Sequence, residues 1–138
     1  MSSLQTQTTS FKAECWQAIH NLLTDTLKIA LYNNTASLDA ATTGYTSTGE
    51  ISGAGYAAGG QVLTGAAIGS SGYVVFADFS DPVWSGTLTA RYALIYNSSK
   101  SNKSVAVLDF GANKTPINTF TVQFPVGTAT TALLRSSN

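Results

Sequence analysis

The stretch TLTARYALIYNSSKSNKSVAVLDF, residues 87–110, decides the fold, because its pattern is that of a β-hairpin. In the first arm, apolar side chains occupy alternate positions from Leu88 to Tyr96, which is the period of a half-buried strand. The second arm, Ser104 to Phe110, is apolar at almost every position, so we expect neighbours to cover both of its faces. Asn, Ser and Lys fill residues 97–103 between the arms, as is typical of a solvated turn. The stretch therefore predicts the central antiparallel strand pair of a β-sandwich.

The rest of the chain predicts further strands and one helix. Apolar or alternating runs bounded by turn residues predict strands at Leu27–Tyr32, Gln61–Thr64, Tyr73–Asp78, Thr119–Phe124 and Thr131–Arg135. Ser10 is expected to cap a helix from Phe11 to about Leu23, in which apolar residues recur every three or four positions. We therefore predict a mainly β fold, an antiparallel β-sandwich of seven to eight short strands with one N-terminal helix and a jelly roll as the more specific alternative.

The chain of 138 residues is long enough for one domain. We expect residues 1–10 to be an extended N-terminal arm, because their polar side chains cannot bury enough apolar area to fold alone. Residues 11–138 are expected to form the sandwich with its leading helix. A neighbouring subunit would hold the arm, so deleting residues 2–10 should weaken attachment and leave the fold intact.

Two segments are expected to contact other surfaces. The long loop from Asn33 to about Gly49 has little periodicity, and a loop of this length in a small domain usually lies on something or has a function. The segment ISGAGYAAGG, Ile51 to Gly60, is dominated by Gly and Ala around Tyr56. Its backbone is therefore predicted to approach another surface closely or to adopt positive φ angles.

The composition favours a subunit of an assembly and excludes several other classes of protein. Charged residues make up only 10% of the chain and the formal net charge is zero, which gives little repulsion between copies. The seven Lys and Arg residues are scattered, so no basic stripe for nucleic acid is expected. Cys15 is the single cysteine, which excludes an intrachain disulfide. The sequence has neither a secretory signal pattern nor an apolar run of membrane length, and we expect synthesis in the cytoplasm and no membrane partner.

We expect no catalytic residues, no cofactor and no metal. His20 is the single histidine, no G-x-S-x-G motif accompanies it, and Cys15 lies too far around a helix to pair with it. A packed structural histidine is therefore the expectation. Gly53, Gly55 and Ala58 fit a loose dinucleotide pattern outside any βαβ context, and a contact loop is the better interpretation. Asp78 and Asp81 lack the surrounding pattern of a calcium loop.

Polar arm residues and aromatic side chains near small-residue loops are the candidate partner contacts. Aromatic rings give a large contact area at low cost in conformational entropy. The residues that we expect to contact a partner are Gln5, Thr8, Trp16, Tyr45, Tyr56 and Trp84. For the aromatic residues, packing beneath the long loops is the alternative.

Several segments resemble a family of small virion structural proteins of tailed bacteriophages. The resemblance extends over nearly the whole chain after Ser10 and is carried by Phe11–Lys12, Leu27–Tyr32, Gly49–Gly53 with Gly55–Tyr56 and Gly59–Gly60, Ala93–Asn97, Val105–Gly111 and Phe120–Pro125. Within that class, the size and the predicted sandwich are most similar to capsid decoration, or cement, proteins.

The resemblance implies a protein that is not an enzyme. It implies a location on the virion, at the outer capsid surface, with the major capsid protein as the partner and a homo-dimer or homo-trimer as the assembled form. The alternative is a glycan-binding or adhesion module of a phage tail or capsid, in which Tyr56, Tyr73 or Trp84 would stack on sugars.

Overall fold

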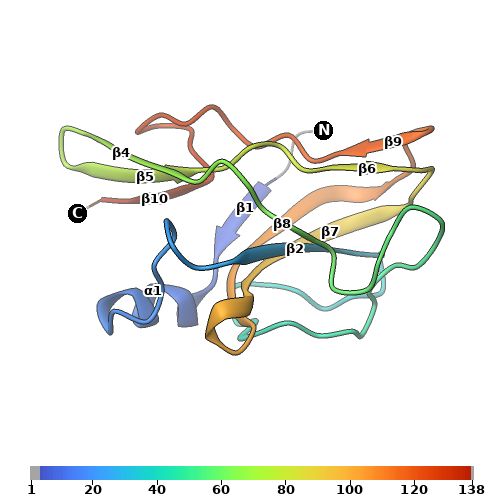
Figure 1. Ribbon diagram of the computed structural model, residues 1–138, viewed down its shortest axis with the longest axis horizontal. Coiled ribbons are helices and arrows are strands. Elements are labelled where there is room, and N and C mark those ends of the chain that lie inside the picture. Colours follow the sequence, from blue (N-terminus) through green and yellow to red (C-terminus); the bar gives the residue numbers. More distant parts are fainter. Residues whose placement is uncertain (1–3, 138) are drawn as a thin grey trace.

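The computed structural model describes residues 4–137 and shows a mainly β chain with one α-helix (Figure 1). The elements are β1 (Leu4–Gln7), α1 (Thr9–Trp16), β2 (Leu27–Tyr32), β3 (Gln61–Val62), β4 (Ala67–Ser71), β5 (Val74–Asp78), β6 (Val83–Ser85), β7 (Ala90–Asn97), the 3-10 helix η1 (Ser98–Lys100), β8 (Lys103–Lys114), β9 (Thr119–Thr121) and β10 (Leu134–Ser136). The strand pairs of these sheets are all antiparallel. The predicted antiparallel β-sandwich with one N-terminal helix is confirmed, with ten strands in the described part of the chain rather than seven to eight. The jelly-roll alternative stays a prediction.

The predicted hairpin lies at the centre of the largest sheet, which has the strand order β1-β8-β7-β2-β3. Leu94 of β7 lies opposite Val107 of β8, and both strands are buried along most of their length. The polar tip forms η1, followed by Ser101 and Asn102 in the left-handed conformation. The sequence pattern thus located this strand pair and its turn correctly.

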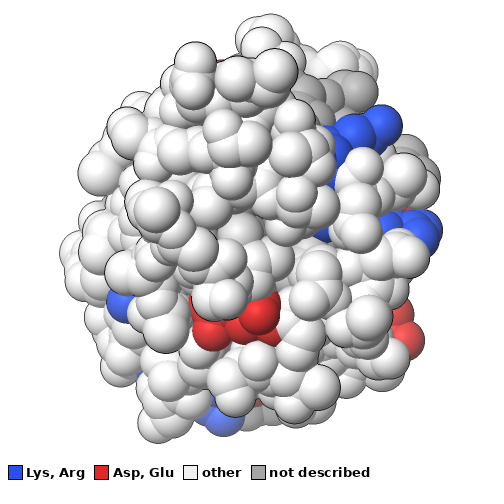
Figure 2. Space-filling view, turned by 90° about the vertical axis from the view of Figure 1, so that its right-hand side faces the viewer, with Lys and Arg blue, Asp and Glu red and all other residues white. Residues whose placement is uncertain are grey.

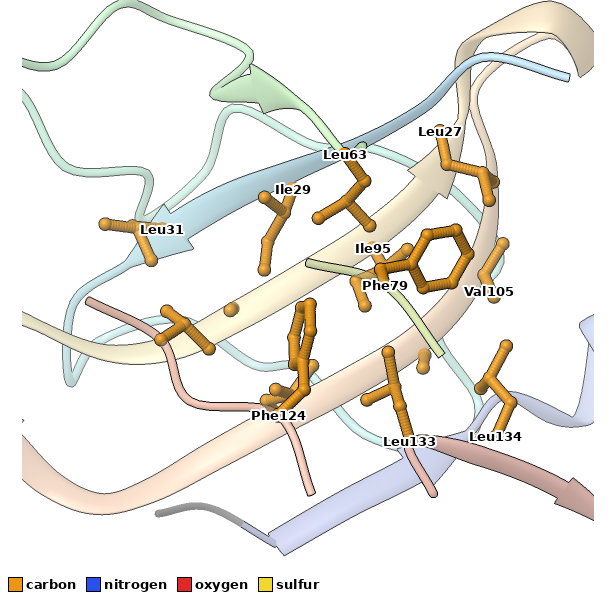
Figure 3. Packing of buried hydrophobic residues seen from close by; sticks show 14 of the residues in the cluster. Leu27, Ile29, Leu31, Leu63, Phe79, Ile95, Val105, Phe124, Leu133 and Leu134 are labelled. Carbon is orange, nitrogen blue, oxygen red and sulfur yellow. The ribbon is translucent and has the colours of Figure 1, made fainter. Parts of the chain in front are cut away.

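Two smaller sheets cover one face of the large sheet, with the strand orders β10-β5-β4 and β6-β9. Between the layers lies the main apolar core, which Figure 3 shows from close by. Ile29 and Ile95 of the large sheet face Phe79 and Phe124 across this core. Leu133 and Leu134 pack in the same core. Phe120 is fully buried and its ring lies 6.3 Å from Trp84 in an edge-on arrangement.

The long loop after β2 covers the opposite face of the large sheet. Ala36 and Leu38 of this loop pack in a second apolar cluster with Tyr32, Leu94 and Tyr96. Short bridges join the loop to the large sheet, one of them between Gly44 and Lys103 of β8. The surface on which this loop lies is therefore the large sheet of the same chain.

The Gly/Ala-rich segment approaches other backbone closely, as predicted. Gly60 has a φ of +78°, and a Cβ atom there would lie 1.8 Å from the Ile29 carbonyl oxygen. Gly55 has a φ of +92°, and a Cβ atom there would lie 1.8 Å from the Ser85 carbonyl oxygen. Both positions therefore need glycine for space and for conformation.

The helix is shorter than predicted. It begins at Thr9 with Thr8 as the N-cap, whose side chain accepts a hydrogen bond from the Phe11 amide, and it ends at Trp16 instead of continuing to about Leu23. Ala18 follows in the left-handed conformation, and the Ile19 and Ala18 amides donate to the carbonyls of Glu14 and Cys15. This Schellman arrangement turns the chain away from the helix axis, so the apolar repeat beyond Trp16 is not helical.

The N-terminal segment also differs from the prediction. Residues 4–7 are extended, but they form β1 and pair with β8 of the same chain, from Leu4 opposite Asp109 to Gln7 opposite Ala106. Thr8 is the helix cap, so deleting residues 2–10 would remove an edge strand and a capping residue. With this pairing in view, we expect the deletion to destabilise the domain rather than to leave the fold intact.

Candidate partner-binding surface

An open groove of about 960 Å³ lies at the end of the molecule that carries α1. Its walls come from α1 and β1 on one side and from the β10-β5-β4 sheet on the other. Figure 1 shows these elements together at the left-hand end, with α1 apart from the small sheet. The volume is near the upper end of the range of about 300–1,000 Å³ that is usual for ligand pockets, so the groove has room for a sizeable partner group.

The apolar wall of the groove exists because the small sheet extends beyond the core. Leu134, Ala77 and Ile68 lie opposite one another on β10, β5 and β4, so their side chains share one face. Leu134 and Ala77 are 4% and 5% exposed, whereas Ile68 is 49% exposed. Val75, on the same face of β5, is 50% exposed. The face is therefore covered at β10 and uncovered toward β4.

Trp16 lies on the other wall, at the C-terminal end of α1. Its side chain is 94% exposed, and it lines the groove together with Phe11 and Cys15 of the same helix. An indole so exposed leaves a large apolar area in water, and such residues dominate the energy of many interfaces. Trp16 is thus the clearest anchor for a partner in the described part of the chain.

Two predicted contacts, Gln5 and Trp16, line this same groove. Gln5 is half-buried in β1, and its neighbour Gln7 donates through Nε2 to the Arg135 carbonyl of β10 at 2.7 Å. That side-chain bond joins two edge strands that share no backbone ladder. Gln5 was predicted to lie in a separate arm and Trp16 in the helix, and the structure places both in the lining of one groove.

Thr8 and Trp84 are wrong as surface contacts, because both are inside the molecule. Thr8 is fully buried, and its hydroxyl lies 2.9 Å from that of Ser104 in β8. Trp84 is 5% exposed and packs on Phe120 and Tyr56. For Trp84 the alternative interpretation, a ring packed under a loop, is the one that the structure shows.

Tyr45 and Tyr56 meet at one carboxylate. Their hydroxyls donate to the two oxygens of Glu50, each at 2.6 Å, and the Gly59 amide donates to Glu50 Oε2 at 2.7 Å. Burial, and then the hydrogen bond to Glu50, raises the pKa of Tyr45 to about 12. The same causes in the same order raise the pKa of Tyr56 well above its usual range. Glu50 therefore holds separate parts of residues 33–60 together, and Tyr56 joins them to the sheet because its hydroxyl also accepts from the Leu31 amide of β2 at 3.0 Å.

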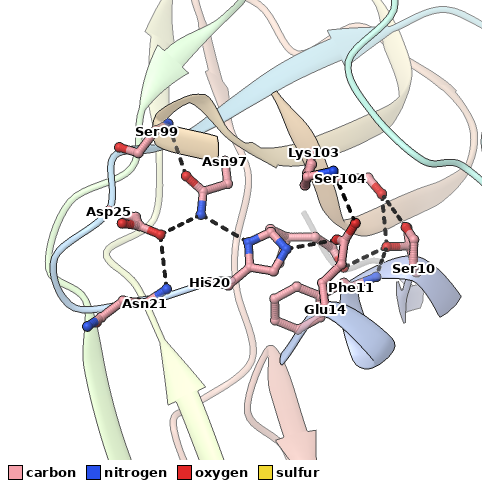
Figure 4. A network of polar contacts seen from close by, with 12 residues as sticks. Ser10, Phe11, Glu14, His20, Asn21, Asp25, Asn97, Ser99, Lys103 and Ser104 are labelled. Atoms are coloured by element: carbon pink, nitrogen blue, oxygen red, sulfur yellow. Dashed lines mark hydrogen bonds and ion pairs between the residues drawn. The ribbon is translucent and has the colours of Figure 1, made fainter. Parts of the chain in front are cut away.

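His20 belongs to a polar network at the tip of the β7–β8 hairpin (Figure 4). Its side chain is fully buried, with Nε2 at 2.9 Å from Glu14 and Nδ1 at 3.0 Å from the Asn97 amide nitrogen. Because the Asn97 amide donates to Nδ1, the ring proton lies on Nε2 and points at Glu14. The Asn97 amide also donates to Asp25 at 2.8 Å. His20 is therefore a packed structural histidine, although it lies after the helix rather than on it.

The acidic residues of the described chain form no metal site. Among residues 4–137, no group of three or more His, Cys, Asp or Glu side chains is placed to hold an ion. Asp78 has one buried oxygen without a hydrogen-bond partner, and burial, followed by repulsion from Asp81, raises its pKa.

Charged groups are sparse outside this network. On the end of the molecule opposite α1, charged side chains form only small and separated patches (Figure 2).

Among the residues that the structure describes, no helix has the length and apolar character of a membrane span.

Comparisons with known proteins found no counterpart for this arrangement. No family model, no curated protein and no solved structure matches the chain.

The sequence also contains a local signal for the β4–β5 hairpin that forms one wall of the groove. Ile68 and Val75 flank the turn at Gly72 and Tyr73, and this spacing is typical of a hairpin. Local sequence patterns do not show how far this hairpin extends beyond the core.

Proposed function

We propose that the protein is a non-enzymatic structural protein of a tailed-bacteriophage virion, a decoration or cement protein of the outer capsid surface. In this role it clamps neighbouring major capsid subunits after synthesis in the cytoplasm of the host bacterium. It acts as a homo-dimer or homo-trimer on the particle.

The observation that carries the proposal is the groove with Trp16 at its rim. Trp16, Ile68 and Val75 present apolar surface at one end of a compact sandwich, where a partner protein would bury it. An exposed apolar surface of this kind is typical of protein–protein interfaces. Because the sequence resembles small virion proteins, we propose that this partner is the major capsid protein.

The rest of the molecule suits a rigid clamp. Both faces of the large sheet are covered by the chain itself, one by the small sheets and one by the 33–49 loop. With a formal net charge of zero, copies can lie close together on a lattice with little repulsion. Interfaces repeated by symmetry add avidity that a single weak contact lacks.

The test uses virions of the phage that encodes the chain. Cryo-electron microscopy should find the protein on the outer capsid surface, bound across adjacent capsid subunits. Particles stripped of it should release DNA at a lower temperature and regain resistance when the purified protein is added back. Its absence from the capsid, or equal heat resistance of stripped and decorated particles, would contradict the proposal.

The glycan-binding alternative has less support. Of the three rings considered as a stacking platform, Trp84 is buried and Tyr56 is bound to Glu50, and Tyr73 alone is strongly exposed, at 91%. A single exposed ring at a hairpin tip gives no platform. A preference for particular sugars on a glycan array would favour this alternative over the capsid role.

A further inference from the structure

We infer that the groove binds an extended, acidic segment of another protein as an added β-strand next to β1. This inference rests on the proposed function and adds to it the chemistry of the partner segment. Three features of the groove support it: an open strand edge, an uncovered apolar wall and a local excess of positive charge.

The open edge belongs to β1. The Thr8 amide donates to the Val105 carbonyl of β8, and Gln7 lies opposite Ala106 in the next pair. Since backbone groups of antiparallel strands point to alternate sides, the amide and carbonyl of Gln5 and Gln7 point away from β8. Within the described chain, β8 is the one strand that pairs with β1. An incoming strand therefore finds a row of free donors and acceptors.

The apolar wall gives an added strand a place for its side chains. Alternate side chains of a strand point to the same face, so every second residue of the segment would turn toward the groove. There they would meet Trp16 on one wall and Ile68 and Val75 on the other. We therefore expect apolar residues at every second position of the segment.

The charge of the groove selects an acidic segment. Lys12 and Arg135 line it, and the lining includes no Asp or Glu. Neither of these cations forms an ion pair with a described residue, whereas Arg91, Lys100 and Lys103 do. A carboxylate in the bound segment would pair with one or both cations as the apolar contacts exclude water.

The partner is a different protein rather than a second copy of this chain. Most carboxylates of this chain are already engaged: Glu14 binds His20, Glu50 binds tyrosines, and Asp109 pairs with Arg91. Asp25 lies near Lys100 and accepts from Asn97. The chain thus has few free acids with which to fill its own groove.

A selection of displayed random peptides on the purified full-length protein tests the inference. We expect enrichment of peptides with apolar residues at alternate positions and at least one Asp or Glu. Hydrogen exchange with a selected synthetic peptide should show new protection at the Gln5 and Gln7 amides. Enrichment of basic peptides, or no enrichment, overturns the inference, as does protection confined to other surfaces.

Four variants then locate the binding site. Lys12→Glu with Arg135→Glu, and separately Trp16→Ala, should each weaken the selected peptide at least about tenfold. Gln5→Pro should do the same, because it removes an outward amide that the β1–β8 ladder does not use. Gln5→Ala keeps that amide and removes only the side chain, so it should weaken binding clearly less than Gln5→Pro. Equal weakening by Gln5→Pro and Gln5→Ala would contradict strand addition.

The inference and the proposed function can fail separately. If the selected peptides bind as described but the protein is absent from capsids, the function falls and the groove assignment stands. If the protein decorates capsids and the groove variants decorate them equally well, the function stands and the inference falls. If light scattering shows that the groove variants lose self-association instead, the occupant is a second copy and the inference is wrong.

Discussion

The two faces of the five-stranded sheet are covered by different means. On one face, Phe120 of β9 and the residues Phe79 and Phe124, which follow β5 and β9, contribute to a continuous apolar core. On the other face, the 33–49 loop contributes Ala36, Leu38 and the partly buried Tyr45. Hydrogen bonds join this loop to the hairpin and the sheet, among them the bond from the Tyr45 amide to the Asn102 carbonyl and the bond from the Tyr32 hydroxyl to the Thr46 carbonyl. The first cover is held mainly by buried apolar area, and the second mainly by hydrogen bonds.

This difference implies that the two covers have different stabilities. Loss of apolar packing between sheets affects the whole domain, because both layers share one core. Loss of a polar anchor frees the loop alone, since the hairpin beneath it keeps its own ladder. We therefore expect the loop to open in local events and the sandwich to unfold as a unit.

The largest expected effect comes from the sandwich side. Phe120→Ala should lower the free energy of unfolding by about 3–5 kcal/mol, because it leaves a cavity beside Trp84 and Phe110. Urea unfolding followed by circular dichroism measures this loss. Phe120→Leu is the matched control and should cost clearly less. Equal values for the two variants would show that the site collapses around the cavity.

A smaller and local effect is expected at Glu50. Glu50→Ala removes the acceptor shared by Tyr45, Tyr56 and the Gly59 amide. Because the freed donors can bond to water once the loop opens, we expect a net loss of about 1–3 kcal/mol. Hydrogen exchange should speed up in residues 33–60 and stay unchanged in β7 and β8. Glu50→Gln retains one oxygen acceptor and should show a smaller effect. Faster exchange throughout the core would remove the distinction between the two faces.

Alkaline pH should loosen the same loop. Because burial and the hydrogen bond to Glu50 raise the pKa of Tyr45 to about 12, folding favours the protonated phenol. The stability from this group is complete below the unfolded pKa of about 10 and is lost as the pH rises toward 12. Ultraviolet titration of tyrosine ionisation, with Tyr45→Phe as the comparison, measures the shift. A normal titration of all tyrosines would contradict the anchored loop.

The smallest effect is expected at the surface that nothing covers. Trp16→Ala should change the free energy of unfolding by no more than about 0.5 kcal/mol, because the indole is 94% exposed. Trp84→Ala, at 5% exposure, should cost about 3–5 kcal/mol and provides the contrast. Iodide quenching of fluorescence distinguishes the two rings before any unfolding. A large loss of stability in the Trp16 variant would indicate that α1 packs through this ring.

The sequence predicted the centre of the fold better than its margins. The β7–β8 hairpin was correct because both strands and their turn lie in one continuous stretch. The end of α1 was missed because it depends on the left-handed Ala18 and on contacts of His20 with Asn97, which lies far along the chain. The strands β1 and β6 are short, and pairing with the distant strands β8 and β9 defines them.

The sequence predicted some of the residues of the groove, but not which side chains are exposed. Gln5 and Trp16 were expected to contact a partner, and both line the groove. Thr8 and Trp84 were expected there too, yet composition alone cannot tell an aromatic ring on a loop from one beneath it. Exposure depends on which elements stop short of covering a face, as the sheet that carries Ile68 does.

The pairing of β1 with β8 also has a consequence for synthesis of the protein. Leu4 pairs with Asp109, so β1 leaves the ribosome well before its partner strand β8 has been made. During that time its edges are open to other nascent chains. The sequence of β1, LQTQ, has few apolar residues, which lowers the tendency of the waiting strand to aggregate.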